Sequence, residues 1–111
     1  MDIQGRVAGN VTILELQGKL VLDDGLRRLR DEVDAAVREG RELLLDLQGV
    51  PYVDSAGLGE IVRKHATVCR QGGRLKLLHV NERIQGLLLT AHLQSVVETF
   101  DSEAAALKSF T

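Results

Sequence analysis

Hydrophobic and polar positions alternate along the first part of the chain as they do in strands. Residues 2–8 and 11–17 are predicted to be two strands, and Gly9-Asn10 between them is typical of a two-residue hairpin turn. The next apolar run, residues 43–47, carries leucine on both faces, which is typical of a strand buried inside a sheet. The chain is therefore predicted to begin with a hairpin and to continue with a central strand.

Two further strands are predicted later in the chain, at residues 74–80 and 95–100. In the first of them the alternation places an apolar pair on each face: Leu75 with Leu77, and Leu78 with Val80.

The segment between the hairpin and the central strand predicts a first helix that ends near Glu39. Its apolar stripe consists of Leu22, Leu26, Leu29, Val33 and Val37. Asp23 and Asp24 are expected to cap its start, where aspartate also meets the positive end of the helix dipole. Gly40 is expected to end it.

A second helix is predicted to start close to Ser55 and to stop at Gly72-Gly73. Its residues at helical spacing are Leu58, Ile61, Val62, His65, Ala66 and Cys69. His65 is interpreted as a packed residue of this stripe.

Two shorter helices are expected near the C-terminus. Asn81 is predicted to cap one that packs through Ile84, Leu87, Leu88 and Ala91. Asp101 and Ser102 are predicted to open the other, which packs through Ala106, Leu107 and Phe110. Strands that alternate with helices predict an α/β fold: a single domain over residues 1–111, with a mixed β-sheet, an N-terminal hairpin and about four helices.

Composition narrows the classes of function. The net charge of −2 disfavours nucleic acid as a partner, and aromatic residues make up only 3% of the chain, too few for a base-stacking platform. No apolar run approaches the roughly 20 residues of a membrane span, and no secretory signal is visible, so we expect no membrane partner. The lone cysteine, Cys69, fits the reducing cytoplasm.

Patterns typical of catalysis are missing. His65, His79 and His92 share no metal-ligand spacing with Cys69, and we expect no metal site. The chain contains no phosphate-binding loop, no dinucleotide fingerprint and no nucleophile elbow around Ser55. We therefore expect a protein that is not an enzyme and needs no cofactor.

Ser55 allows two interpretations. Serine is common at a helix N-cap, and the residue pattern alone favours this role. Gly57 and Gly59, however, are unfavourable in a first helical turn, at about 1 kcal/mol each relative to alanine. Small residues there would leave the backbone open to another molecule, with Ser55 displayed for a partner or a modifying enzyme.

The hexapeptide Asp54-Ser55-Ala56-Gly57-Leu58-Gly59 resembles the Asp-Ser-Ser-Gly-Leu-Gly motif of the STAS domain family, the anti-sigma factor antagonists. In that family the motif follows a buried strand and opens a helix, and the resemblance in the order of elements covers nearly all of the chain. The first serine of the motif is phosphorylated by a partner kinase that also serves as the anti-sigma factor. Ser55 matches this serine, and Ala56 replaces the second serine.

The resemblance implies a bacterial regulator of transcription that works by partner switching. Unphosphorylated on Ser55, it would sequester an anti-sigma factor that is also a serine kinase, and so free a sigma factor. The same resemblance implies that residues 54–59 bind the partner and that Ser55 is the phosphoacceptor. We expect a monomer, with a weak dimer as the alternative.

One position departs from the family. Gly18-Lys19-Leu20-Val21 stands where the family usually has Gly-Glu-Leu-Asp, and that aspartate is implicated in contact with a partner or a nucleotide. Val21 puts this contact in doubt.

Two other functions are kept open. One is a receiver phosphorylated on Asp46 or Asp54, which needs an acidic pair and a lysine; Asp23-Asp24 and Lys76 fit these roles poorly. The other is a STAS accessory subunit of a transporter or sensory complex, in which Ser55 is merely a cap. The anti-sigma function leads because the motif keeps its acceptor serine.

Overall fold

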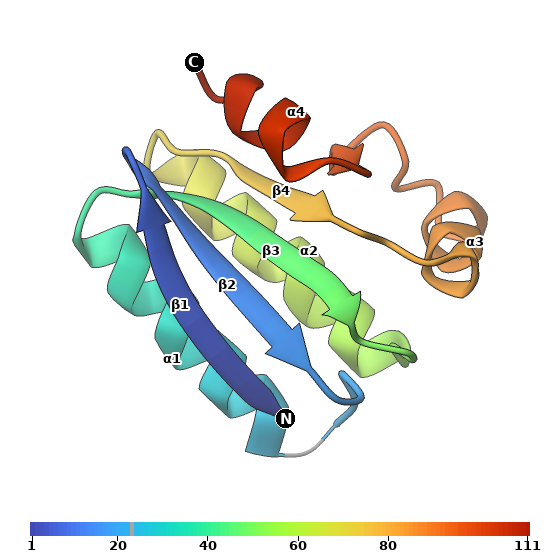
Figure 1. The fold of residues 1–111 in the computed structure, drawn as a ribbon. Coiled ribbons are helices and arrows are strands. Elements are labelled where there is room, and N and C mark those ends of the chain that lie inside the picture. Colours follow the sequence, from blue (N-terminus) through green and yellow to red (C-terminus); the bar gives the residue numbers. More distant parts are fainter. Residues whose placement is uncertain (23) are drawn as a thin grey trace.

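A computed structural model describes residues 1–22 and 24–111. Its five strands form one sheet in the order β1-β2-β3-β4-β5. The strands are β1 (Asp2–Ala8), β2 (Val11–Gln17), β3 (Glu42–Gly49), β4 (Leu75–Leu78) and β5 (Thr99–Phe100). β1 and β2 are antiparallel, and each later strand runs parallel to its neighbour (Figure 1). The predicted hairpin and mixed sheet are confirmed.

The helices cover the two faces of this sheet unequally. They are α1 (Asp24–Arg38), α2 (Ser55–Arg70), α3 (Glu82–Thr90) and α4 (Glu103–Lys108). α1 and α2 pack on one face, α3 lies beyond the end of β4, and α4 lies on the other face (Figure 1). The caps predicted for the last two helices are confirmed: Asn81 accepts from the Ile84 amide at 2.9 Å, and Ser102 from the Ala105 amide at 3.3 Å.

Each face of the sheet has its own apolar core because successive strand residues point to opposite sides. On β3, Leu43, Leu45 and Leu47 enter the larger core with α1, α2 and α3, whereas Leu44 enters a smaller one with α4. All four leucines are at most 1% exposed, as expected for the predicted central strand.

Two expectations about the later strands are wrong. Val80 joins the core of Leu75 rather than the face of Leu78, because His79 has a φ of 58° and breaks the alternation. The last strand is only Thr99–Phe100, since the chain before it turns, with the Val97 amide bonded to the Leu93 carbonyl at 3.1 Å.

The start of α1 also differs from expectation. The helix begins at Asp24, and Leu22 precedes it with 78% of its surface exposed, so Leu22 is not part of the apolar stripe. Asp23 and the side chain of Asp24, both expected to cap this helix, lie outside the described parts of the chain. Gly40 follows the helix with a φ of 71°, the left-handed conformation that glycine adopts without strain.

The buried face of α2 is not the one that hydrophobic periodicity predicts. The buried residues are Gly57, Glu60, Ile61, Lys64 and Val68. Of the predicted stripe, Ile61 alone is buried, and Cys69 is exposed. Glu60 and Lys64 face α1, where they pair with Arg30 at 2.8 Å and Asp34 at 3.0 Å. Charged residues therefore occupy a helix interface that the sequence pattern assigns to apolar ones.

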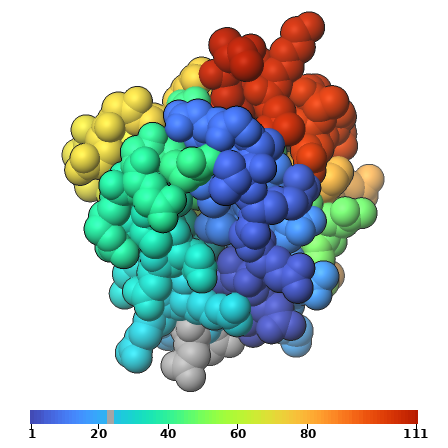
Figure 2. Space-filling model, turned by 60° about the vertical axis from the view of Figure 1, so that its left-hand side comes forward, coloured from blue at the N-terminus to red at the C-terminus, as the bar shows by residue number. Residues whose placement is uncertain are grey.

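One edge of the sheet is formed by β1, which lies beside α1 (Figure 2). From α1, the guanidinium of Arg28 donates to the carbonyls of Met1 at 3.3 Å and Ile3 at 3.2 Å. On the other face of the sheet Arg6 pairs with Glu103, which ties β1 to α4. One carbonyl of β1, that of Ile3, and the carbonyl of Met1 just before the strand thus accept from a side chain of the same molecule.

Glu60 makes the interface between α1 and α2 sensitive to acid. Its carboxylate is 1% exposed and accepts from Arg30 at 2.8 Å and from Arg63 at 3.2 Å. The hydrogen bond from Arg30 lowers the pKa of Glu60, with Arg63 adding to the effect and burial opposing it. A carboxyl group whose pKa is lowered in the folded protein stabilises the fold at pH values above the ordinary pKa of glutamate. This stabilisation is lost as the pH falls through the lowered pKa.

Glu60→Gln should therefore lower the free energy of unfolding at pH 7 by about 1–3 kcal/mol, because hydrogen bonds to a charged group are lost. It should also flatten the fall in stability at acid pH. Urea unfolding at pH 7 and at several values below 4.5 measures both effects, with Glu32→Gln, an exposed position on α1, as the control. Equal acid slopes for Glu60→Gln and the parent would contradict the assignment.

Candidate functional site

Ser55 lies where two loop segments are joined beyond the carboxyl end of β3. Leu20 and Val53 form a parallel bridge. The Leu20 amide donates to the Tyr52 carbonyl at 3.0 Å, and the Asp54 amide donates to the Leu20 carbonyl at 3.2 Å. These main-chain bonds hold the residues before Ser55 in a fixed position.

Asp54, rather than Ser55, caps α2. One carboxylate oxygen of Asp54 accepts from the Gly57 amide at 2.8 Å, and the other accepts from the Leu22 amide at 3.2 Å. Ser55 is the first helical residue and is exposed, and its hydroxyl has no hydrogen-bond partner among the described residues. The interpretation of Ser55 as the capping hydroxyl is therefore wrong, and its side chain is free for another role.

The two glycines of the motif have different structural roles. Gly57 is buried, and a Cβ there would lie 3.0 Å from the carbonyl carbon of Leu20 and closer still to its oxygen. The idea that Gly57 leaves the backbone open to a partner is wrong, because Leu20 already occupies that space. At Gly59 a Cβ would meet only the end of the Arg63 side chain, at 3.4 Å.

A groove of about 620 Å³ runs between α2 and α3 beside Ser55. Tyr52, Ser55 and Leu58 line it on one side, and Arg83, Leu87 and Ala91 line it on the other. The Arg83 guanidinium lies over the Tyr52 ring, 5.9 Å from its centre. We call the groove that these six residues line the Ser55 groove.

The sequence interpretation missed half of the Ser55 groove. It placed Leu87 and Ala91 in the packed face of the third helix, but Leu87 is half-buried and Ala91 is exposed. The available signal was their spacing: Arg83, Leu87 and Ala91 recur every four residues and so share one side of α3.

Leu22 projects on the surface near Ser55. Its amide is held by Asp54 while its side chain is exposed, and Val21 beside it is half-buried. Val21 stands where the family usually has an aspartate, and the next side chain, that of Leu22, is apolar and directed to solvent. Of the remaining motif residues, Ala56 and Gly59 are half-buried.

The geometry does not fit a receiver, because both candidate phosphoacceptors, Asp46 and Asp54, are engaged within the fold. Asp46 is buried and accepts from His79 Nδ1 at 3.0 Å, and both carboxylate oxygens of Asp54 are engaged. Lys76 donates to the hydroxyl of Ser109 at 2.9 Å. Asp23, one half of the acidic pair, lies outside the described chain.

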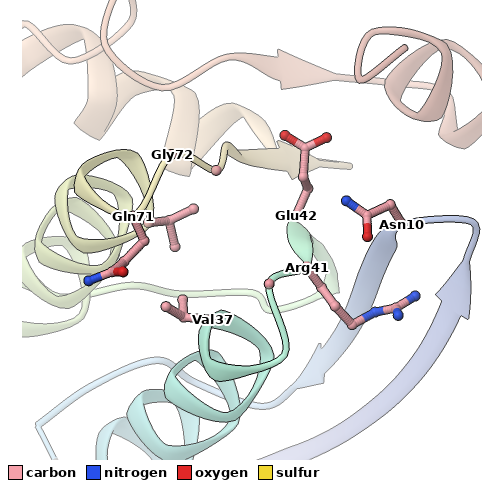
Figure 3. Close-up of a pocket in the computed structure, with 9 residues that line it drawn as sticks. Asn10, Val37, Arg41, Glu42, Gln71 and Gly72 are labelled. Carbon is pink, nitrogen blue, oxygen red and sulfur yellow. The ribbon is translucent and has the colours of Figure 1, made fainter.

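A second, smaller hollow of about 190 Å³ lies at the opposite end of the sheet, where α1 and α2 end (Figure 3). Its two charged side chains are used within the fold. Arg41 extends toward Asn10 and donates to Gly9 O at 2.6 Å, and Glu42 accepts from Arg74 at 2.7 Å. In the described residues, no group of three or more metal-binding side chains is found, and no helix is long and apolar enough to cross a bilayer.

Comparison of the sequence with known protein families shows which family has this fold. A family model described as the STAS domain matches residues 2–106. The chain belongs to the STAS domain family. An anti-sigma-B factor antagonist of Bacillus subtilis (strain 168) is 30% identical over 97 residues, covering 87% of this chain and 80% of the relative. An anti-sigma F factor antagonist of Paenibacillus polymyxa is 29% identical over 99 residues, covering 87% and 84%.

Solved structures agree on the STAS fold. The TM1081 protein of Thermotoga maritima superposes with a TM-score of 0.89 at 23% identity, covering 97% of this chain and 93% of that one. SpoIIAA of Bacillus in its phosphorylated form gives 0.77 at 17% identity, covering 99% and 100%. A sulfate transporter family protein of Wolinella succinogenes gives 0.80 at 23% identity, covering 94% and 87%. At these identities the likeness shows the fold alone.

Gly57→Ala should destabilise the protein by about 1–3 kcal/mol, because the added methyl collides with the Leu20 backbone. Gly59→Ala is the matched control in the same helical turn, and it should stabilise by about 0.4–1 kcal/mol through the unfolded chain. Chemical unfolding of both variants measures the difference. A Gly57→Ala protein as stable as Gly59→Ala would contradict the packing described.

Asp54→Ala should cost about 0.5–2 kcal/mol through loss of the cap, whereas Ser55→Ala should change stability by no more than about 0.5 kcal/mol. The two substitutions are adjacent, so thermal unfolding of the pair separates the capping residue from the displayed one. A larger loss for Ser55→Ala than for Asp54→Ala would reverse the assignment.

Proposed function

We propose that this STAS protein is a phosphorylation-controlled anti-sigma factor antagonist. Unmodified, it binds an anti-sigma factor that is also a serine kinase, and so frees a sigma factor. The observation that carries the proposal is the display of Ser55. Its hydroxyl is exposed in an apolar groove and bonds to none of the described residues, while Asp54 caps the helix. The names of the two curated relatives support the same role.

The proposed binding surface is Ser55 with the apolar side chains on either side of it. Leu22 is 78% exposed, and Leu58 and Leu87 line the groove. Apolar side chains that reach the surface close together are typical of protein interaction sites. Within the motif, Ser55 and Leu58 would touch the partner, while Asp54 and Gly57 would hold the helix end in place. Ala56 and Gly59 would contribute their small size at its margin.

Phosphorylation would change this surface without changing the fold. The kinase transfers the γ-phosphoryl group of ATP to the Ser55 oxygen, which loses its proton, and ADP leaves. The phosphate adds about −1.5 to −2 charges at pH 7 and three acceptor oxygens. A helix N-terminus tolerates this charge, whereas a partner surface that fits an uncharged serine does not.

Ser55 is proposed as a substrate site rather than a catalytic nucleophile, because no described side chain is bonded to its hydroxyl as a base would be. We further propose that residues 1–111 act as one domain and as a monomer in the cytoplasm. These proposals follow from the proposed role of Ser55 and the apolar side chains beside it in binding an anti-sigma factor.

A second candidate is an accessory STAS subunit of a transporter. The sulfate transporter family protein of Wolinella succinogenes has the same fold, so the fold is compatible with this role. In that role Ser55 would remain unmodified. The anti-sigma role is preferred because the sequence relatives at about the same length carry that name.

The test of the proposed function uses Ser55→Ala and Ser55→Asp with the partner captured from the native cell. Ser55→Ala should keep binding and become insensitive to the kinase, and Ser55→Asp should bind at least tenfold more weakly while folding normally, since about 1.4 kcal/mol of repulsion suffices. Ser95→Asp adds the same charge at an exposed site away from the groove and is the control. Isothermal titration and intact-mass analysis after incubation with ATP provide the readouts.

Modification at a residue other than Ser55, or undiminished binding of the phosphorylated protein, would overturn the proposal. Capture of a transporter instead of an anti-sigma factor would favour the second candidate.

A further inference from the structure

We propose that Arg83 receives the phosphate on Ser55, so that phosphorylation closes the Ser55 groove from within the chain. The inference rests on the proposed function, because it assumes that Ser55 carries a phosphate. It adds a mechanism: the apolar surface is covered by the protein's own arginine, in addition to repulsion of the partner by charge.

Arg83 lies in the right place for this contact. It comes from α3 and lines the same groove as Ser55 of α2, so the two side chains share one solvent-filled space. Its guanidinium is held over the ring of Tyr52, at 5.9 Å from the ring centre. Stacking of this kind keeps an arginine oriented without using its hydrogen-bond donors. The donors of Arg83 therefore remain available at the groove.

Arg83 forms no ion pair with the residues that the structure describes. Several other arginines pair with carboxylates of the described residues, among them Arg6, Arg28, Arg30, Arg63 and Arg74. No carboxylate of the described residues pairs with Arg83. The carboxylate among the residues that line the groove, Asp54, already accepts hydrogen bonds at both oxygens. Among the described residues, the guanidinium of Arg83 therefore faces the groove without a carboxylate bonded to it.

The position of Arg83 in its own helix gives no alternative reason for the charge. Asn81 caps α3, Glu82 follows, and Arg83 stands in the first turn, where the helix dipole disfavours a positive side chain. A lysine or arginine that stabilised α3 would be expected in its last turn, which has no basic residue. Besides its contact with the Tyr52 ring, an anion that arrives at the groove would give the charge of Arg83 a partner.

A phosphate on Ser55 supplies that anion. Guanidinium and phosphate form paired hydrogen bonds in a fixed geometry, so the link would join the α2 side of the groove to its α3 side. Leu58 and Leu87, which line the same groove, would then be less accessible to a partner. An aspartate at position 55 is shorter and carries one charge, so it should imitate the phosphate incompletely.

The experiment installs phosphoserine at position 55 of the full chain by amber-codon suppression, so no kinase is needed. Phosphorus-31 NMR then follows the second ionisation of the phosphate, whose ordinary pKa is about 6. In the parent protein Arg83 should hold this pKa below the value in Arg83→Gln by about 0.5 or more, because an adjacent cation favours the dianion. Arg38→Gln, an exposed arginine at the far end of α1, should leave the pKa at the parent value.

Arg83→Lys keeps the charge but not the paired donors, and should give an intermediate pKa. A second readout is dephosphorylation by a broad-specificity phosphatase, which should be severalfold faster for Arg83→Gln than for the parent or Arg38→Gln. Equal titration curves and equal rates for the parent and Arg83→Gln would overturn the inference. A kinase that ignores Ser55 would overturn only the proposed function, because the phosphate here is installed without it.

Discussion

The N-terminus of α2 lies directly against the backbone of Leu20 because Gly57 has no side chain, and the geometry of the site depends on this contact. It brings the loop that follows β2 close enough for the Leu20–Val53 bridge and for the bond from Leu22 to Asp54. The same contact sets the rotation of α2 about its axis. Glu60 and Lys64 then face α1, and Ser55 faces solvent.

Much of the fold could be predicted from local pattern. The hairpin at Gly9-Asn10, the central strand and the caps at Asn81 and Ser102 all depend on neighbouring residues, and all are found. The cap of α2 could not be assigned in this way. Asp54 and Ser55 are adjacent and are both good capping residues, and the main-chain pairing of Asp54 with Leu20, distant in sequence, decides between them.

Hydrophobic periodicity failed where burial is polar or where the backbone is unusual. On α2 the buried Glu60 and Lys64 are satisfied by ion pairs with α1, so apolar residues do not mark the packed face. At the end of β4, the left-handed backbone conformation of His79 places Val80 on the other face of the sheet from the one expected. No pattern in the sequence predicts that conformation for a histidine. The Ser55 groove was missed because its two sides come from segments about thirty residues apart, which only the fold brings together.

The bonds from Arg28 to the carbonyls of Met1 and Ile3 have a consequence for self-association. An outermost strand with free main-chain acceptors is a template on which an unrelated strand can assemble, and this is a common route to aggregation. Because a guanidinium already occupies these acceptors, an incoming strand would first have to displace it. At this end of β1 the structure therefore disfavours pairing with a second strand.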